Sequence, residues 1–334
     1  MAMTVNSAFS EFLKDKVNLD SNVSSQATSS KNWLIDKIHN FVNTDDDFPE
    51  LYSDIDIGFG SFARKTKKRE LDDIDIMIGL SAQGSTYCEY SDRIEIIVPD
   101  SATTLKKLCN DDSNILNSRK VINKFISNLK NIDQYKKADI TRNLQAAVLD
   151  LTSYTWSFDI VPCFFTKEDA FGKTYYLIPD GNGNWMKTDP RIDRQRVTDT
   201  NQRFDGNVLN VIRIMKYWNK RPTMPSMQSY MFENMILDYY ESSYSCSKYV
   251  DVEIPNILSY ISSHIFSSVN DPKGIQGDLN TLSYEDKIKI SDRASSDYLK
   301  ALDARTFENN SDYESSINKW GEIFGGEFPS YGQE

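Results

Sequence analysis

Two short stretches of the sequence, GSFARKT and DDIDI, contain the residues best suited to chemistry. Alternate side chains of a strand share a face, so Asp73 and Asp75 should point the same way while the intervening isoleucines point into a core. Two carboxylates on one face repel each other unless they are solvated or a cation lies between them. Oxygen-only ligation suits Mg²⁺, which takes a couple of carboxylates together with substrate phosphates. This stretch therefore predicts a magnesium site.

Gly60 and Ser61 lie about a dozen residues before the aspartates. Glycine allows the backbone to approach a ligand closely, and a turn here would also supply N–H donors and a hydroxyl. Together these groups could cradle a triphosphate.

A pair of metal ions about 3.5–4 Å apart requires a further, bridging carboxylate. Asp159 is the best candidate, because an isolated carboxylate in an otherwise apolar strand is costly unless it is paired or bound to a metal. Glu95 is the competing candidate for the third carboxylate. Asp54 and Asp56 form a second Asp-x-Asp pair, but this pair precedes the glycines and is the weaker choice.

The elements expected to position these residues change in type along the chain. Helical periodicity opens the chain, near residues 7–13 and 26–42, and one or two helices are expected within 103–129. Strands are predicted near 54–58, 74–76, 93–98, 154–165 and 175–178. Helices then follow from 207 to the Arg221-Pro222 pair and near 227–240, 257–267, 291–304 and 314–323. Helices, a strand-rich middle and further helices indicate an α+β fold.

Composition restricts the classes of function. The chain has 334 residues, with 38 Lys plus Arg against 49 Asp plus Glu, giving a net charge of −11. That balance argues against a protein that grips long nucleic acid. No apolar run of about 18 residues predicts a membrane span, no secretory signal is visible, and four scattered cysteines indicate a reduced, cytoplasmic chain without zinc. With two histidines, a histidine triad has little support.

The combination GSFARKT…DDIDI…FDIVP resembles the DNA polymerase β-like nucleotidyltransferase superfamily. Within it, the chain is similar to the bacterial CD-NTases, the cGAS/DncV-like nucleotidyltransferases of the SMODS group. Further matching segments are IPDGNGNW, VIRIMKYWNK, PSMQSYMFE and WGEIFGGEFPS. The similarity extends over about residues 8 to 331.

The resemblance implies a mixed-sheet catalytic lobe with N-terminal helices, residues 1–204, packed against a helical lobe, residues 205–334, that closes a nucleotide cleft. Lys216 and Ser229 would contact the donor phosphates, and Tyr230 would stack on the base. The three aspartates would hold two Mg²⁺ ions, for which Mn²⁺ could substitute. Asp159 would also help to deprotonate the attacking hydroxyl.

The implied activity is that of a cyclic oligonucleotide synthase, with a cyclic dinucleotide as the expected product. Its partners would be nucleoside triphosphates and a separate effector that reads the product in anti-phage defence, without long nucleic acid or a membrane. Three alternatives stay open: a template-free transferase acting on RNA, protein or a small molecule, a catalytically silent nucleotide-binding regulator, and a linear oligonucleotide synthase activated by double-stranded RNA.

Overall fold

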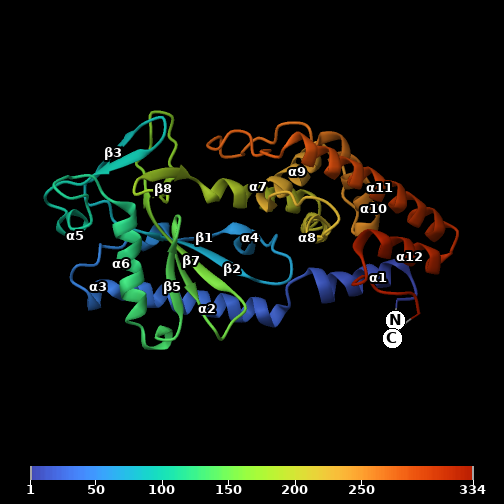
Figure 1. Cartoon of the computed structure of the whole chain (residues 1–334), viewed down its shortest axis with the longest axis horizontal. Coiled ribbons are helices and arrows are strands. Elements are labelled where there is room, and N and C mark those ends of the chain that lie inside the picture. The colour runs from blue at the N-terminus through green and yellow to red at the C-terminus, as the bar shows by residue number, and fades with distance from the viewer. Residues whose placement is uncertain (1, 333–334) are drawn as a thin grey trace. The chain divides into compact units, whose positions relative to one another are not determined.

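The computed structural model describes residues 2–332 and divides into two compact units (Figure 1). The sheet unit comprises Ser21–Ala63 and Glu70–Arg191. The helical unit comprises Met1–Asp20, Arg64–Arg69 and Ile192–Glu334. Each unit is therefore assembled from segments that are distant in the sequence.

Within the described residues, nine strands form one sheet in the sheet unit. The strands are β1 (Ile57–Phe59), β2 (Asp73–Gly79), β3 (Thr86–Glu89), β4 (Ile94–Ile97), β5 (Asp139–Asn143), β6 (Ala146–Asp150), β7 (Ser157–Phe165), β8 (Tyr176–Pro179) and β9 (Trp185–Thr188). Their order is β1-β2-β7-β8-β9-β4-β3, and the β5–β6 hairpin joins β7 through β6. Strands β2 and β7 are parallel and their neighbours antiparallel, so the sheet is mixed. The predicted α+β fold is confirmed.

Short helices and one long helix accompany this sheet. They are α2 (Ser21–His39), α3 (Phe41–Thr44), α4 (Gly60–Ala63), α5 (Thr103–Lys106) and α6 (Ser118–Lys130), with 3-10 turns η2 (Ser53–Ile55) and η3 (Asp133–Tyr135). Helix α6 begins where the Asn117 side chain accepts the first free backbone N–H groups, and it packs along β5 to β8. The ring centre of its fully buried Phe125 lies 5.0 Å from the ring centre of Phe48. This contact forms part of the core of the sheet unit.

The helical unit consists of helices around a separate core. They are α1 (Val5–Phe12), the π-helical turn η1 (Leu13–Val17), α7 (Pro190–Arg203, its first two residues in the sheet unit), α8 (Val208–Asn219), α9 (Ser229–Glu241), α10 (Val250–His264), α11 (Tyr284–Asn309) and α12 (Tyr313–Phe324). Across residues 2–332, none of the helices combines the length and apolar character that crossing a membrane requires.

Helix α1 packs with the C-terminal helices, although it opens the chain. The Phe9 ring lies 5.0 Å from the rings of Trp320 and of Phe328, and the fully buried Phe12 lies 5.4 Å from Phe324. Ala2 also pairs with Tyr331 in an isolated parallel bridge, so the first and last described segments meet within this unit. The observed units therefore differ from the predicted division at residue 204, because these aromatic contacts draw the N-terminal helix into the helical unit.

Most predicted elements appear, with differences that have local causes. The strand expected at 54–58 is instead the turn η2 followed by β1, because the Asp56 carboxylate accepts the Gly79 N–H at 2.7 Å and the chain bends there. Helix α7 was not predicted, because its sequence is almost entirely polar and shows no apolar stripe.

The contacts of Phe9 predict the cost of removing its ring. Replacing buried Phe9 with alanine should lower the free energy of unfolding by about 3–5 kcal/mol, since the cavity lies between three aromatic rings. Urea denaturation would measure this change. Phe171→Ala is the matched control, because that ring is 87% exposed. Equal midpoints for the two variants would contradict the packing of α1 described above.

Candidate active site

Strands β2 and β7 bring two of the predicted aspartates side by side. In their parallel register Asp75 lies opposite Asp159, and Asp73 lies opposite Ser157. Residues opposite each other on neighbouring strands point to the same face, and such strands lie about 4.8 Å apart. Because Asp73 and Asp75 are two residues apart, all three aspartates share one face of the sheet.

The exposure of both strands follows the predicted alternation. The three aspartates are half-buried, whereas the residues between and beside them are closed off from solvent. These buried residues are Ile74, Ile76, Phe158 and Ile160, each at most 1% exposed. The register is therefore fixed by the core on the other face, and the carboxylates are placed by that core.

Asp159 has the electrostatics of a crowded site. Burial raises the pKa of its carboxyl, and the negative charge of Asp73 raises it further. Farther along the same face, Met77 and Val161 belong to a buried apolar cluster. The aspartates therefore lie at the edge of an apolar surface, where repulsion between charges is stronger than in bulk water.

Gly60 lies directly against the Asp75 carboxylate. Strand β1 pairs with β2 so that Phe59 is opposite Asp75, and Gly60 follows with a φ of +68°. A Cβ at Gly60 would lie 1.8 Å from Asp75 Oδ2, so a side chain here would require the carboxylate to move. Ser61 is the next residue, in the short helix α4. The structure thus brings Gly60, Ser61 and the three aspartates together within the sheet unit.

The competing carboxylates have other partners. The Asp56 carboxylate accepts the Gly79 N–H, and its Oδ2 lies 2.6 Å from His39 Nε2. These contacts stabilise the turn between η2 and β1. Glu95 accepts from Arg93 Nε at 2.8 Å on β4, which β8 and β9 separate from β7 in the sheet order. Both facts support the choice of Asp159 as the third carboxylate.

The fit of these residues to a metal rests on their donor chemistry. Three oxygen donors on one face suit Mg²⁺. Among residues 2–332, however, no three His, Cys, Asp or Glu side chains are arranged as a metal-binding group. The backbone register and the donor set are present, and the ligand roles of Asp73, Asp75 and Asp159 stay a prediction.

Lys216, predicted to contact phosphates, lies in the helical unit and is buried on α8. Its Nζ forms an ion pair with Glu233 of α9 and donates to the carbonyl and the hydroxyl oxygens of Thr66, each at 3.3 Å. Burial lowers the pKa of Lys216, and Glu233 opposes that shift. The structure therefore places this lysine in a buried ion-pair network.

Ser229 and Tyr230, the other two predicted nucleotide-binding residues, begin helix α9. Ser229 is exposed, whereas the Tyr230 hydroxyl donates to Asp193 at 2.6 Å and to Asp271 at 3.1 Å. The Lys273 Nζ lies 4.3 Å from the centre of the Tyr230 ring. Cations and carboxylates thus occupy the surroundings of this ring, and its role in base stacking stays a prediction.

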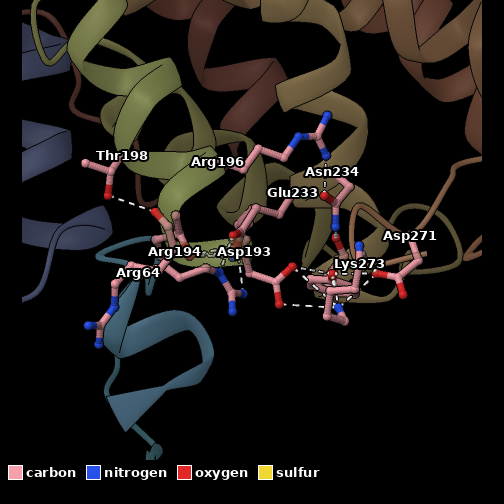
Figure 2. A network of polar contacts seen from close by, with 12 residues as sticks. Arg64, Asp193, Arg194, Arg196, Thr198, Glu233, Asn234, Asp271 and Lys273 are labelled. Carbon is pink, nitrogen blue, oxygen red and sulfur yellow. Dashed lines mark hydrogen bonds and ion pairs between the residues drawn. The ribbon is translucent and has the colours of Figure 1, made fainter. Parts of the chain in front are cut away.

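Sequence reasoning missed Glu233, one of the residues labelled in the polar network of Figure 2. Its carboxylate is 1% exposed and accepts from Arg64 Nε at 2.7 Å and from Thr66 Oγ1 at 2.7 Å. A signal was available, because Glu233 follows Met231 and Phe232 in an apolar stretch of α9. The argument that selected Asp159, a lone carboxylate among apolar residues, applies here as well.

The contact between Gly60 and Asp75 predicts a sharp difference between two glycines. Gly60→Ala should lower the free energy of unfolding by about 2 kcal/mol or more, since it combines a positive φ with a clash against the carboxylate. Gly58→Ala should cost less than about 1 kcal/mol, because its Cβ would meet only atoms at 3.8 Å and beyond. Chemical denaturation of both variants would measure these changes. An equal loss of stability in the two variants would contradict the predicted difference.

The raised pKa of Asp159 predicts a pH-dependent gain in stability when the carboxyl is removed. Since the folded-state pKa lies above the unfolded value, ionising Asp159 favours unfolding, and stability is lost as pH rises through the folded-state pKa. Asp159→Asn should therefore be more stable than wild type at pH 7 in EDTA, with the difference shrinking toward pH 4. Urea unfolding at several pH values would test this. Asp54→Asn, an exposed control, should show no such trend.

Comparisons with known proteins agree with this geometry. No family model matches the chain. A probable cyclic nucleotide synthase of Bacillus cereus strain VD146 is 47% identical over 332 residues, covering 99% of each chain. CdnC of E. coli MS115-1, solved with ATP, superposes with a TM-score of 0.70 at 16% identity, covering 97% of this chain and 99% of its own.

DncV of Vibrio cholerae in its apo form gives a TM-score of 0.60 at 14% identity, over 82% of this chain and 69% of its own. At these identities the two solved structures show a shared fold, the nucleotidyltransferase fold that the motifs predicted. The Bacillus relative adds a full-length match in sequence. The chain therefore belongs to the bacterial CD-NTases, the cGAS/DncV-like nucleotidyltransferases.

Proposed function

We propose that this nucleotidyltransferase joins nucleoside triphosphates into a cyclic oligonucleotide, a cyclic dinucleotide in the simplest case, and releases pyrophosphate. The register that sets Asp75 beside Asp159, next to the Gly60–Ser61 turn, carries the proposal. The 47% identity to a probable cyclic nucleotide synthase supports the cyclic product.

Asp73, Asp75 and Asp159 would hold two Mg²⁺ ions, which supply charge neutralisation on the phosphates and lower the pKa of the acceptor hydroxyl. Asp159 would accept the proton of that hydroxyl as a general base. Gly60 would leave room for the phosphates beside Asp75, and the Ser61 hydroxyl and backbone N–H would bind them.

In each transfer, a bond forms between a ribose oxygen of the acceptor and the α-phosphorus of the donor. The bond from that phosphorus to pyrophosphate breaks, and the hydroxyl proton goes to Asp159. A second transfer within the linear product closes the ring. These residues act by positioning and charge, so the chemistry needs no histidine.

Lys216, Ser229 and Tyr230 would complete nucleotide binding. Ser229 is exposed at the start of α9 and would donate to a phosphate. Lys216 would contribute its positive charge from its place beside Glu233, and Tyr230 would stack on a base once the cations beside its ring are rearranged. Membership of the family supports a cytoplasmic role in anti-phage defence, with the product read by a separate effector.

Asparagine substitutions test the proposed chemistry. Asp73→Asn, Asp75→Asn and Asp159→Asn should each lower the rate of product formation at least about a hundredfold, because each removes a charge from the site. The assay would incubate protein with labelled nucleoside triphosphates and Mg²⁺ or Mn²⁺, and detect a phosphatase-resistant product by mass spectrometry. EDTA should abolish the product.

Glu95→Gln and Asp54→Asn are matched controls, since both remove a carboxylate of the sheet unit that lies outside the site. They should retain activity within about twofold. Undiminished product from the Asp73 and Asp75 variants would refute the assignment of the site. A labelled macromolecule in place of a small resistant species would instead indicate the template-free transferase.

A further inference from the structure

We propose that Glu233 is a positioning residue that holds both Lys216 and the segment following the Gly60–Ser61 turn in the places that triphosphate binding requires. The inference rests on the proposed function, because it explains how two of the proposed phosphate-binding groups are kept in position. Glu233 itself would touch neither substrate nor metal.

The contacts of Glu233 link Lys216 to the segment that follows the Gly60–Ser61 turn. Oε1 accepts from Arg64 Nε at 2.7 Å, and Oε2 accepts from Thr66 Oγ1 at 2.7 Å, from Arg64 Nη2 at 3.4 Å and from the Lys216 ammonium. All four residues belong to the helical unit, and Thr66 is fully buried. One carboxylate therefore binds the proposed phosphate-contacting lysine and two residues of a single short segment.

That segment, Arg64–Arg69, begins three residues after Ser61 in the chain. Its far end is also anchored, because Arg69 donates through its backbone N–H to Val17 at 2.8 Å and through its side chain to the carbonyls of Asn18 and Lys14, both at 3.0 Å. Hydrogen bonds thus anchor both ends of the segment. Arg64 follows helix α4 directly in the chain, so Glu233 contacts the residue that comes immediately after that helix.

The charge balance explains why a carboxylate is needed at this place. Arg64 and Lys216 carry two positive charges in the interior, and Glu233 is the carboxylate that contacts both. Lys216 and Arg64 lower the pKa of Glu233 to about 2 against the opposing effect of burial. A neutral glutamine would remove the carboxylate that contacts both cations, while the charge of Asp193 would still act on Arg64, so Lys216 and Arg64 should both be held less firmly.

Another buried glutamate of the same unit provides a contrast. Glu253 of α10 accepts from the Tyr240 hydroxyl at 3.0 Å and from the Ser247 N–H at 2.8 Å. These partners lie in helix α9 and its following loop, and none is a proposed nucleotide-binding residue. Glu253→Gln is thus a control for the general effect of neutralising a buried glutamate.

The experiment compares the affinity for a nucleoside 5′-(α,β-methylene)triphosphate with that for the matching monophosphate, using adenine and guanine probes with Mg²⁺ in equilibrium dialysis. Glu233→Gln and Thr66→Val should reduce the preference for the triphosphate about tenfold, as expected for the loss of one charge-assisted contact. Thr66→Ser, which keeps the hydroxyl, should restore the preference to within about twofold.

A merely structural role would lower the fraction of protein that binds, and the melting temperature, without changing the ratio of the two affinities. The inference is overturned if Glu233→Gln and Thr66→Val keep the full wild-type preference, or if Glu253→Gln reduces it equally. Should Glu233→Gln fail to fold, the Thr66→Val and Thr66→Ser pair decides. A wild-type protein without any triphosphate preference would refute the proposed function itself.

Discussion

Repulsion between carboxylates held on adjacent parallel strands is the constraint on which the site depends. Asp75 and Asp159 cannot move apart by a shift in register, because a slip of one residue would turn the buried face of β2 or β7 outward. The free energy gained by burying residues such as Ile76 and Ile160 therefore keeps the like charges together. The core on one face of the sheet fixes the electrostatics of the other.

The backbone next to this face follows from the same crowding. Because the Asp75 carboxylate lies where a Cβ of residue 60 would be, the turn after β1 must have glycine, and a positive φ is available to it. The turn leads into α4 and then into a segment that packs within the helical unit.

Sequence reasoning succeeded where local periodicity decides the outcome. The shared face of Asp73 and Asp75 follows from strand alternation, and Asp159 was identified because a lone carboxylate among apolar residues requires a reason. The assignment of α1 to the helical unit depends on Phe9 meeting Trp320, which no local pattern encodes. The partners of Glu233 could not be predicted from a local pattern either. Arg64 and Lys216 are more than 150 residues apart in the sequence, and only the folded structure brings both to the same carboxylate.

Two carboxylates of this protein, the buried Glu233 and the half-buried Asp159, have pKa values shifted in opposite directions, although burial raises the pKa of both. Glu233 has a lowered pKa because two cations surround it, so its charge is already compensated within the fold. Asp159 has a raised pKa because burial and a neighbouring carboxylate oppose its ionisation. A protein gains nothing in stability from the second arrangement. A carboxyl group with this combination of burial and a neighbouring like charge is a candidate for binding a cation, which is the role proposed for Asp159.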